Sequence, residues 1–154
     1  MTVNQYANQF KIGFSLWGFL AFALQELPYL PCLLCPPVDN PLANNNPANI
    51  FFGILEQGGG ILTVALLILI VRKTVVKKSI FLFIAILCIL VYFVCWFFYF
   101  SGITNGWLIV IGLSAVVPIY YFFIALWVKN DFAIITSVLF FIGHTGSNML
   151  NYLR

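Results

Sequence analysis

The sequence predicts an all-α membrane helix bundle with five transmembrane helices, built as a single domain over residues 1–154. Hydrophobic residues make up 63% of the chain and charged residues only 7%, whereas about a quarter of the residues in a soluble domain are charged. The mean hydropathy is +1.06. The apolar runs are about 20 residues long, as a spanning helix requires, and they lack the strict alternation of barrel strands. The lipid bilayer is therefore the first partner that we expect. The net charge of +3 is too small to indicate nucleic-acid binding.

The first predicted span covers residues 12–30 and follows a short polar segment. Its apolar core continues into Gln25 and Glu26 without a small-residue cleavage site, so we expect it to remain as an anchor in the mature protein. Prolines and asparagines crowd the stretch from Pro31 to Pro47, and they predict the one long loop of the chain.

The second, third and fourth predicted spans cover residues 49–71, 79–100 and 107–128. Asn49 is a residue type that favours the N-cap of a helix. Pro118 predicts a kink near the middle of the fourth span.

The fifth predicted span covers residues 132–150, but its uninterrupted apolar character stops at Ile142. The alternative is therefore a bundle of four spans followed by a short C-terminal helix that ends part-way across the membrane.

Basic residues predict the orientation. With five spans, six of the seven basic residues fall on one side, at Lys11, Lys129 and the 72–78 cluster, and only Arg154 falls on the other. The positive-inside rule then places the N-terminus and the 72–78 loop in the cytoplasm, and the 31–47 loop outside.

Three ionisable side chains are predicted at membrane depth. Glu56 lies about 10 Å into the second span at 1.5 Å per residue, Glu26 is near the outer end of the first, and His144 lies within the fifth. A carboxylate that faces lipid is costly, so we expect Glu56 to point into the bundle.

Polar neighbours extend this group. Asn148 and Asn151 follow His144 at spacings of four and three, which place all three on one helix face, and Gln57 adjoins Glu56. We therefore predict an outward-facing polar pocket with Glu56 as its floor. The candidate ligand-binding residues are Glu56, Glu26, His144, Asn148, Gln57 and Asn151.

A purely structural role is the alternative to ligand binding for these residues. Glu26 is near enough to the interface to be solvated, and His144 and Asn148 are also typical of interhelical hydrogen bonds worth about 1 kcal/mol each. Gly58, Gly59 and Gly60 favour close packing of the second span against the first or the fifth.

Cys32 and Cys35 form a C-x-x-C directly after the first span. This placement resembles the quinone-linked membrane oxidases that form disulfides, over about half a dozen residues. That family needs a second cysteine pair in another outer loop, and the loop from Ser101 to Gly106 has none. A chain that cannot relay thiol exchange is a poor oxidase. The pair could also form a local disulfide or pack as two small apolar residues.

Three functions fit these observations. The first is binding or transport of a small amphipathic or cationic molecule, attracted by carboxylates and aromatic rings. The second is a membrane-embedded enzyme that acts on a lipid or isoprenoid by Glu/His acid–base chemistry. The third is an accessory subunit of a larger membrane complex. If the first function is correct, a transporter of this size would be expected to form a homodimer. No known motif assigns a cofactor, and no ligand spacing indicates a metal.

Overall fold

The computed structural model describes residues 8–37, 39–73 and 76–153. The predicted all-α class is confirmed. Within these ranges, four helices are long and apolar enough to cross a membrane. They are the helix of α4 (Ile50–Gly53), η2 (Ile54–Gly58) and α5 (Gly59–Leu69); α6 (Ile80–Phe100); the helix of η3 (Leu108–Ala115) and α7 (Val116–Val128); and α8 (Asp131–Tyr152).

These four helices correspond to the second to fifth predicted spans. Asn49 is an N-cap as predicted, and its Oδ1 accepts a hydrogen bond from the Phe52 amide at 3.0 Å. The backbone before Pro118 is π-helical. α8 continues for 22 residues without a break through its polar segment. The half-length alternative for the C-terminal helix is therefore not the observed structure.

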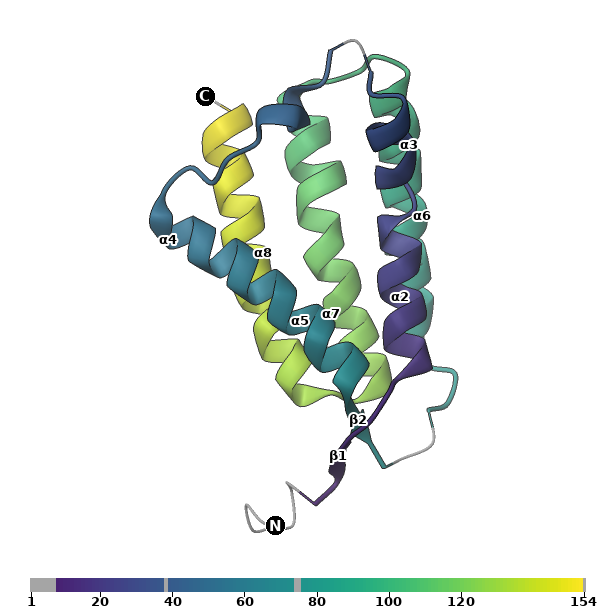
Figure 1. The fold of residues 1–154 in the computed structure, drawn as a ribbon. Helices are drawn as coiled ribbons and strands as arrows, with labels where there is room; N and C mark the ends of the chain where they lie inside the picture. The colour runs from purple at the N-terminus through teal and green to yellow at the C-terminus, as the bar shows by residue number, and fades with distance from the viewer. Residues whose placement is uncertain (1–7, 38, 74–75, 154) are drawn as a thin grey trace.

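The first predicted span is not one helix. Residues 10–12 form strand β1 (Phe10–Ile12), and the helical part is divided into α2 (Leu16–Glu26) and α3 (Tyr29–Leu34). Pro28 causes the division because it has no amide hydrogen for the Leu24 carbonyl. Pro31, predicted to lie in the loop, lies in the first turn of α3, where amides have no partner within the helix. Figure 1 shows α3 stacked above α2, beside α6.

A two-stranded ribbon that the sequence did not predict joins β1 to β2 (Ile70–Arg72) in antiparallel register. The pairing continues beyond the strands, because the amides of Gly13 and Ser15 donate to the carbonyls of Leu69 and Ile68 at 2.9 and 2.7 Å. These carbonyls belong to the C-terminal turn of α5 and have no partner within the helix. The ribbon therefore fixes the start of α2 to the end of α5.

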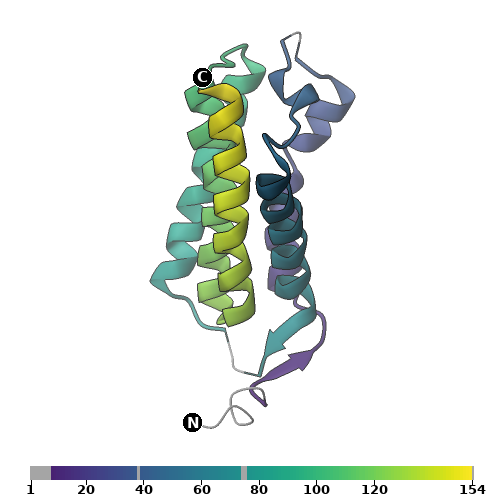
Figure 2. The ribbon, with the colours of Figure 1, turned by 90° about the vertical axis from the view of Figure 1, so that its left-hand side faces the viewer.

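The helix of η3 and α7 is the centre of the bundle. In its most apolar stretch of 18 residues 67% of the residues are buried, whereas the share in the other three long helices is 17–33%. α6 and α2 pack on one side of it, and α8 and α5 on the other. Figure 2 shows α8 running beside α4 and α5.

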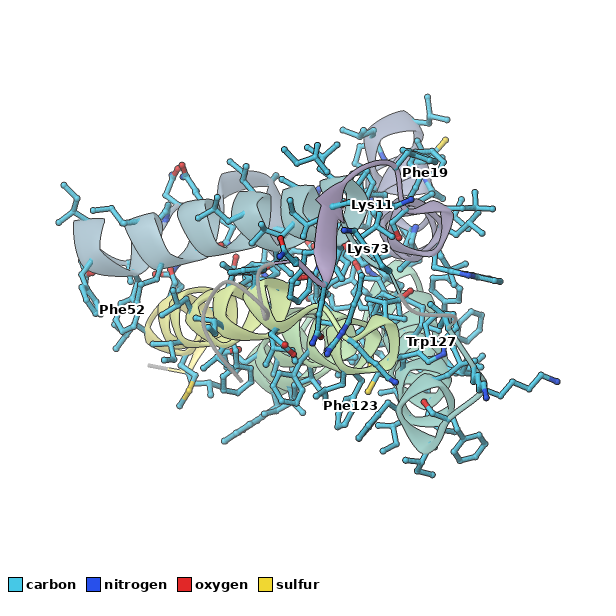
Figure 3. The ribbon with its side chains drawn as sticks, turned by 90° about the horizontal axis from the view of Figure 1, so that it is seen from below. Lys11, Phe19, Phe52, Lys73, Phe123 and Trp127 are labelled. Atoms are coloured by element: carbon cyan, nitrogen blue, oxygen red, sulfur yellow. The ribbon has the colours of Figure 1, made fainter. Side chains whose placement is uncertain are left out.

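The connecting segments gather at the two ends of the bundle, and on which side of a membrane each end lies stays a prediction. The β1–β2 ribbon and the connection at Lys129 lie at one end, and the proline-rich loop, the Ser101 turn and the end of α8 lie at the other (Figure 1). Lys11 and Lys73 are labelled in Figure 3, which looks onto the first end. Residues 1–7 and Arg154, which also entered the prediction of orientation, lie outside the described residues.

Candidate functional site

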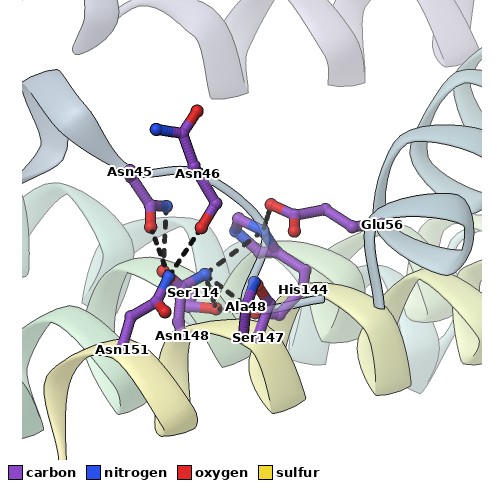
Figure 4. Close-up of polar contacts among 9 residues, drawn as sticks. All are labelled: Asn45, Asn46, Ala48, Glu56, Ser114, His144, Ser147, Asn148 and Asn151. Atoms are coloured by element: carbon purple, nitrogen blue, oxygen red, sulfur yellow. Dashed lines mark hydrogen bonds and ion pairs between the residues drawn. The ribbon is translucent and has the colours of Figure 1, made fainter. Parts of the chain in front are cut away.

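The centre of the site is an ion pair between η2 and α8. Oε1 of Glu56 lies 2.8 Å from Nδ1 of His144, and each side chain is only 18% exposed. Figure 4 shows Glu56 reaching from its own helix toward the His144 ring. Glu56 thus points into the bundle, where His144 compensates part of the cost of burying its carboxylate.

Two backbone features bring this pair together. Glu56 lies in a π-helical turn, a wider turn that changes the direction of a side chain and often occurs at functional sites. Gly143 precedes His144 and lies against the backbone of Leu55 and Glu56, where an added Cβ would overlap the Glu56 amide nitrogen. Only a glycine allows the two helices to approach so closely.

Asn148 connects the ion pair to a neighbouring helix and to a loop. Its side chain is 1% exposed, and its Nδ2 donates to the His144 carbonyl at 2.8 Å and to Ser114 Oγ at 3.1 Å. Its Oδ1 accepts a hydrogen bond from Asn45 Nδ2 at 2.9 Å. The amide is fully engaged and holds His144 in place through the backbone.

Residues 40–48, here called the strap, cross the end of the bundle from α6 to α8. At the α6 side, Tyr99 donates to Asn40 Oδ1 at 2.7 Å. At the α8 side, Asn151 donates to Asn45 and to the Asn46 carbonyl at 3.1 and 2.8 Å, and Ser147 accepts from the Ala48 amide. Figure 4 shows these amides gathered above α8.

A pocket of about 490 Å³ lies beside the ion pair, at mid-height in the bundle. Its walls come from α2 and α3 on one side and from α5 on the other, with α7 and α8 behind. The lining residues are Phe22, Gln25, Glu26, Tyr29, Gly60, Ile61, Val64, Ala65, Val117, Tyr121, Phe140 and His144. Most of these side chains are apolar or aromatic, which is typical of a small-molecule site.

The pocket has the form of a wedge between α2 and α5. The two helices touch at Gly18, where an added Cβ would overlap the Leu67 carbonyl. They diverge toward Glu26 and Gly60, which line the pocket. α5 is in turn packed onto α8 at Gly59, where an added Cβ would lie 2.7 Å from the Phe140 amide nitrogen. The pocket is open rather than enclosed, and α2 and α5, between which it lies, diverge at the front of the bundle as drawn in Figure 1.

Comparison of the chain with protein-family models, with curated proteins and with solved structures finds no match. The function must therefore be argued from the geometry of the site.

Two polar side chains of α2 line the pocket, and they differ in their hydrogen-bond partners. Gln25 is 4% exposed and is fixed by two tyrosines, donating to Tyr92 at 3.0 Å and accepting from Tyr121 at 2.9 Å. Glu26 is half-buried and has no hydrogen-bond or ion-pair partner within the described residues. Its carboxylate is therefore the free charge of the pocket.

The six candidate residues occupy different places. Glu26 and His144 line the pocket, Glu56 lies behind His144, and Asn148 is buried beside it. Asn151 is exposed at the end of α8 and binds the strap. Gln57 does not line the pocket but an adjoining groove with Asn49 and Ile61.

The sequence did not point to three residues that contribute hydrogen bonds to the site. Asn45 is 103 residues from Asn148, and nothing local marks their contact. Ser114, from η3, donates to the His144 carbonyl at 3.1 Å. Tyr121 was one of many aromatic residues, and only its bond to Gln25 distinguishes it.

Cysteines and metal ligands form no site in the described part of the chain. Cys32, Cys35, Cys88 and Cys95 are all free thiols, and no group of three or more His, Cys, Asp or Glu side chains gathers there to hold a metal ion.

Proposed function

We propose that this chain is an integral membrane protein that binds or transports a small amphipathic molecule with a cationic head group. The observation that carries the proposal is the wedge pocket itself. It combines an apolar and aromatic lining with the carboxylate of Glu26, which has no partner among the described residues, and none of the described residues that line it is a lysine or arginine.

Charge favours a cation. A carboxylate held among apolar side chains is stabilised by any positive group that reaches it. Glu26 has no such group of its own in the described structure, whereas the Glu56 carboxylate has His144 as its partner. A bound cationic head would neutralise Glu26.

The aromatic rings favour the same kind of ligand. Phe22, Tyr29, Tyr121 and Phe140 line the pocket, and ring faces attract cations by about 0.5–2 kcal/mol each when water is excluded. Apolar side chains on α5, among them Ile61 and Val64, would contact the hydrophobic part of the molecule. The lateral opening gives an amphipathic molecule direct access from the bilayer.

We also propose the five-span topology for the intact protein. α2 and α3 together cover residues 16–34, which is about 28 Å at 1.5 Å per residue, close to the ~30 Å hydrocarbon core. In this topology the ribbon and residues 72–78 are cytoplasmic, and the part of the predicted 31–47 loop that follows α3 is outside. The exposed apolar residues of the bundle would then face lipid. Access to the pocket from the outer side stays a prediction.

The proposal is tested with two probes of the same shape and opposite charge. Tetraphenylphosphonium is a lipophilic cation, and tetraphenylborate is its anionic counterpart. We expect the purified protein in detergent to bind the cation and not the anion, and Glu26→Gln to weaken cation binding at least tenfold. Asp39→Asn removes an exposed carboxylate of the proline-rich loop and serves as the control. Equal binding of both probes, or unchanged binding by Glu26→Gln, would contradict the proposal.

The Glu56–His144 pair favours a second candidate function, an enzyme that moves a proton on a lipid or isoprenoid. A carboxylate bound to Nδ1 fixes the orientation of an imidazole and leaves Nε2 to act as a general base. We would then expect turnover of a component of a lipid extract that His144→Gln abolishes. Turnover that persists in His144→Gln would contradict the enzyme function. So would the absence of turnover by the wild type on lipid extracts of several membranes.

A further inference from the structure

The two nitrogens of the His144 ring have different surroundings. Nδ1 lies 2.8 Å from the Glu56 carboxylate. Asn148 Nδ2 is also 3.4 Å from Nδ1, but its two hydrogens already have nearer acceptors in the His144 carbonyl and Ser114 Oγ. A carboxylate only accepts hydrogen bonds, so Nδ1 carries a hydrogen and donates it to Glu56.

Nε2 is the ring nitrogen that is available to a ligand in the pocket. The His144 ring lines the pocket, and Nε2 has no hydrogen-bond partner among the residues that the structure describes. Nε2 is not fully enclosed by the protein, so a small molecule in the pocket can reach it. A second proton on this imidazole would therefore be placed at Nε2, next to the space that a ligand occupies.

That second proton changes the charge of the pocket by one unit. With Nε2 bare, the imidazole is neutral: it still donates from Nδ1 to Glu56, and Nε2 offers a lone pair to the pocket. With Nε2 protonated, a positive N–H borders the same space. A ligand cation at Glu26 and a proton at Nε2 would then repel each other in a poorly solvated site, where charges interact more strongly than in water.

We propose that cation binding in the wedge pocket is coupled to the release of one proton from Nε2 of His144, so that the site exchanges protons for cations. This inference rests on the proposed function and adds its coupling ion. The proton leaves Nε2 for the aqueous buffer, and its electron pair remains on the ring, where it can face the ligand.

Other titratable groups around His144 are few. Glu56 comes from η2, Glu26 from α2, Tyr29 from α3 and Tyr121 from α7. α4, α5 and η3 have no titratable side chains. The tyrosines of the pocket stay neutral near pH 7, and imidazole is the side chain whose charge changes in that range. Glu26 is thus the competing source of a released proton, and the experiment must distinguish it from His144.

Calorimetric titration with tetraphenylphosphonium, in two buffers of different ionisation enthalpy, gives the number of protons released per bound cation. For the wild type we expect this number to approach one at the acidic end of the titration and to fall toward zero as the pH of the buffer is raised. The affinity should fall by up to about tenfold per pH unit toward acid. In His144→Gln we expect no release and an affinity independent of pH, whereas Asp39→Asn should behave as the wild type.

A second measurement needs no variant, because the chain contains a single histidine. In protein labelled with ¹⁵N-histidine and purified without a histidine tag, one residue gives all ring signals. We expect Nε2 to carry the proton at low pH, and saturating tetraphenylphosphonium to keep it bare to a lower pH.

The outcomes separate the two proposals. Cation binding without proton release at any pH would overturn the exchange and leave the proposed function standing. Release that persists in His144→Gln would assign the proton to Glu26 and overturn the role of His144. If the wild type does not bind the cation, both proposals fail.

Discussion

Gly143 lies directly against the backbone of Glu56, one residue before the histidine to which Glu56 is bound. The closest approach of η2 and α8 is thus at the same height as their ion pair. This contact determines whether the Glu56 side chain can reach His144.

Gly143→Ala should therefore separate the two helices. An added Cβ would overlap the Glu56 amide nitrogen and lie 2.5 Å from the Leu55 carbonyl carbon, so we expect a loss of about 1–3 kcal/mol in the free energy of unfolding. The control is Gly58→Ala, since Gly58 has nothing within 4 Å of an added Cβ. It should raise stability by about 0.5–1 kcal/mol. Denaturation in mixed micelles measures both, and equal effects would argue against the close contact.

Asn148→Ala should loosen the strap. It removes the bond to Asn45 and leaves Ser114 Oγ without a donor in a buried site. We expect a loss of about 1–3 kcal/mol and amide exchange about tenfold faster at Asn45 and Ala48, whose amides are hydrogen-bonded. Asn151→Ala, at an exposed position, should cost no more than about 0.5 kcal/mol. A larger effect of Asn151→Ala would place the main attachment of the strap at the exposed contacts.

Asn130→Ala should be among the most damaging polar substitutions. Asn130 caps α8 through the Ala133 amide and donates to the Leu66 and Ile70 carbonyls at 2.8 and 2.9 Å. Its loss removes a cap and takes a donor from both carbonyls, of which Leu66 keeps only the bond from the Ile70 amide, so we expect about 2–4 kcal/mol of destabilisation. Asn105→Ala removes only an exposed cap and should cost about 0.5–1 kcal/mol. Similar melting temperatures for the two variants would refute this ranking.

The five-span topology predicts which positions an impermeant maleimide reaches. In a chain with its four cysteines replaced, Asp39→Cys and Asn105→Cys should react in intact cells. Lys11→Cys and Lys77→Cys should react only after permeabilisation. Labelling of positions 11 and 39 from the same side would mean that α2 and α3 do not cross the membrane.

The sequence predicted most of the helices because their signals are local. Apolar length located α6 and α8 to within two residues at each end, and Asn49 marked a cap by its type alone. The division of the first span was visible in principle at Pro28. The prediction failed there because a long apolar run was given more weight than one missing amide hydrogen.

The site was only partly predictable. The cost of a carboxylate at membrane depth singled out Glu56 and the helix spacing singled out His144, but neither fixes a distance between them. The direction of Gln57 depends on the rotation of a helix that contains a π turn, which changes the register of its faces. The contact between Asn45 and Asn148 depends on the path of a loop, and no pattern in the chain encodes it.

The ribbon and the Gly18 contact hold the lower ends of α2 and α5 at a fixed separation. The width of the pocket's mouth is therefore set by the angle at which the two helices diverge. A small tilt at the base produces a larger displacement near Glu26, because the displacement grows with distance from the fixed end. Substitutions in β1 or β2, remote from every residue of the pocket, should consequently alter the size of molecule that the mouth admits.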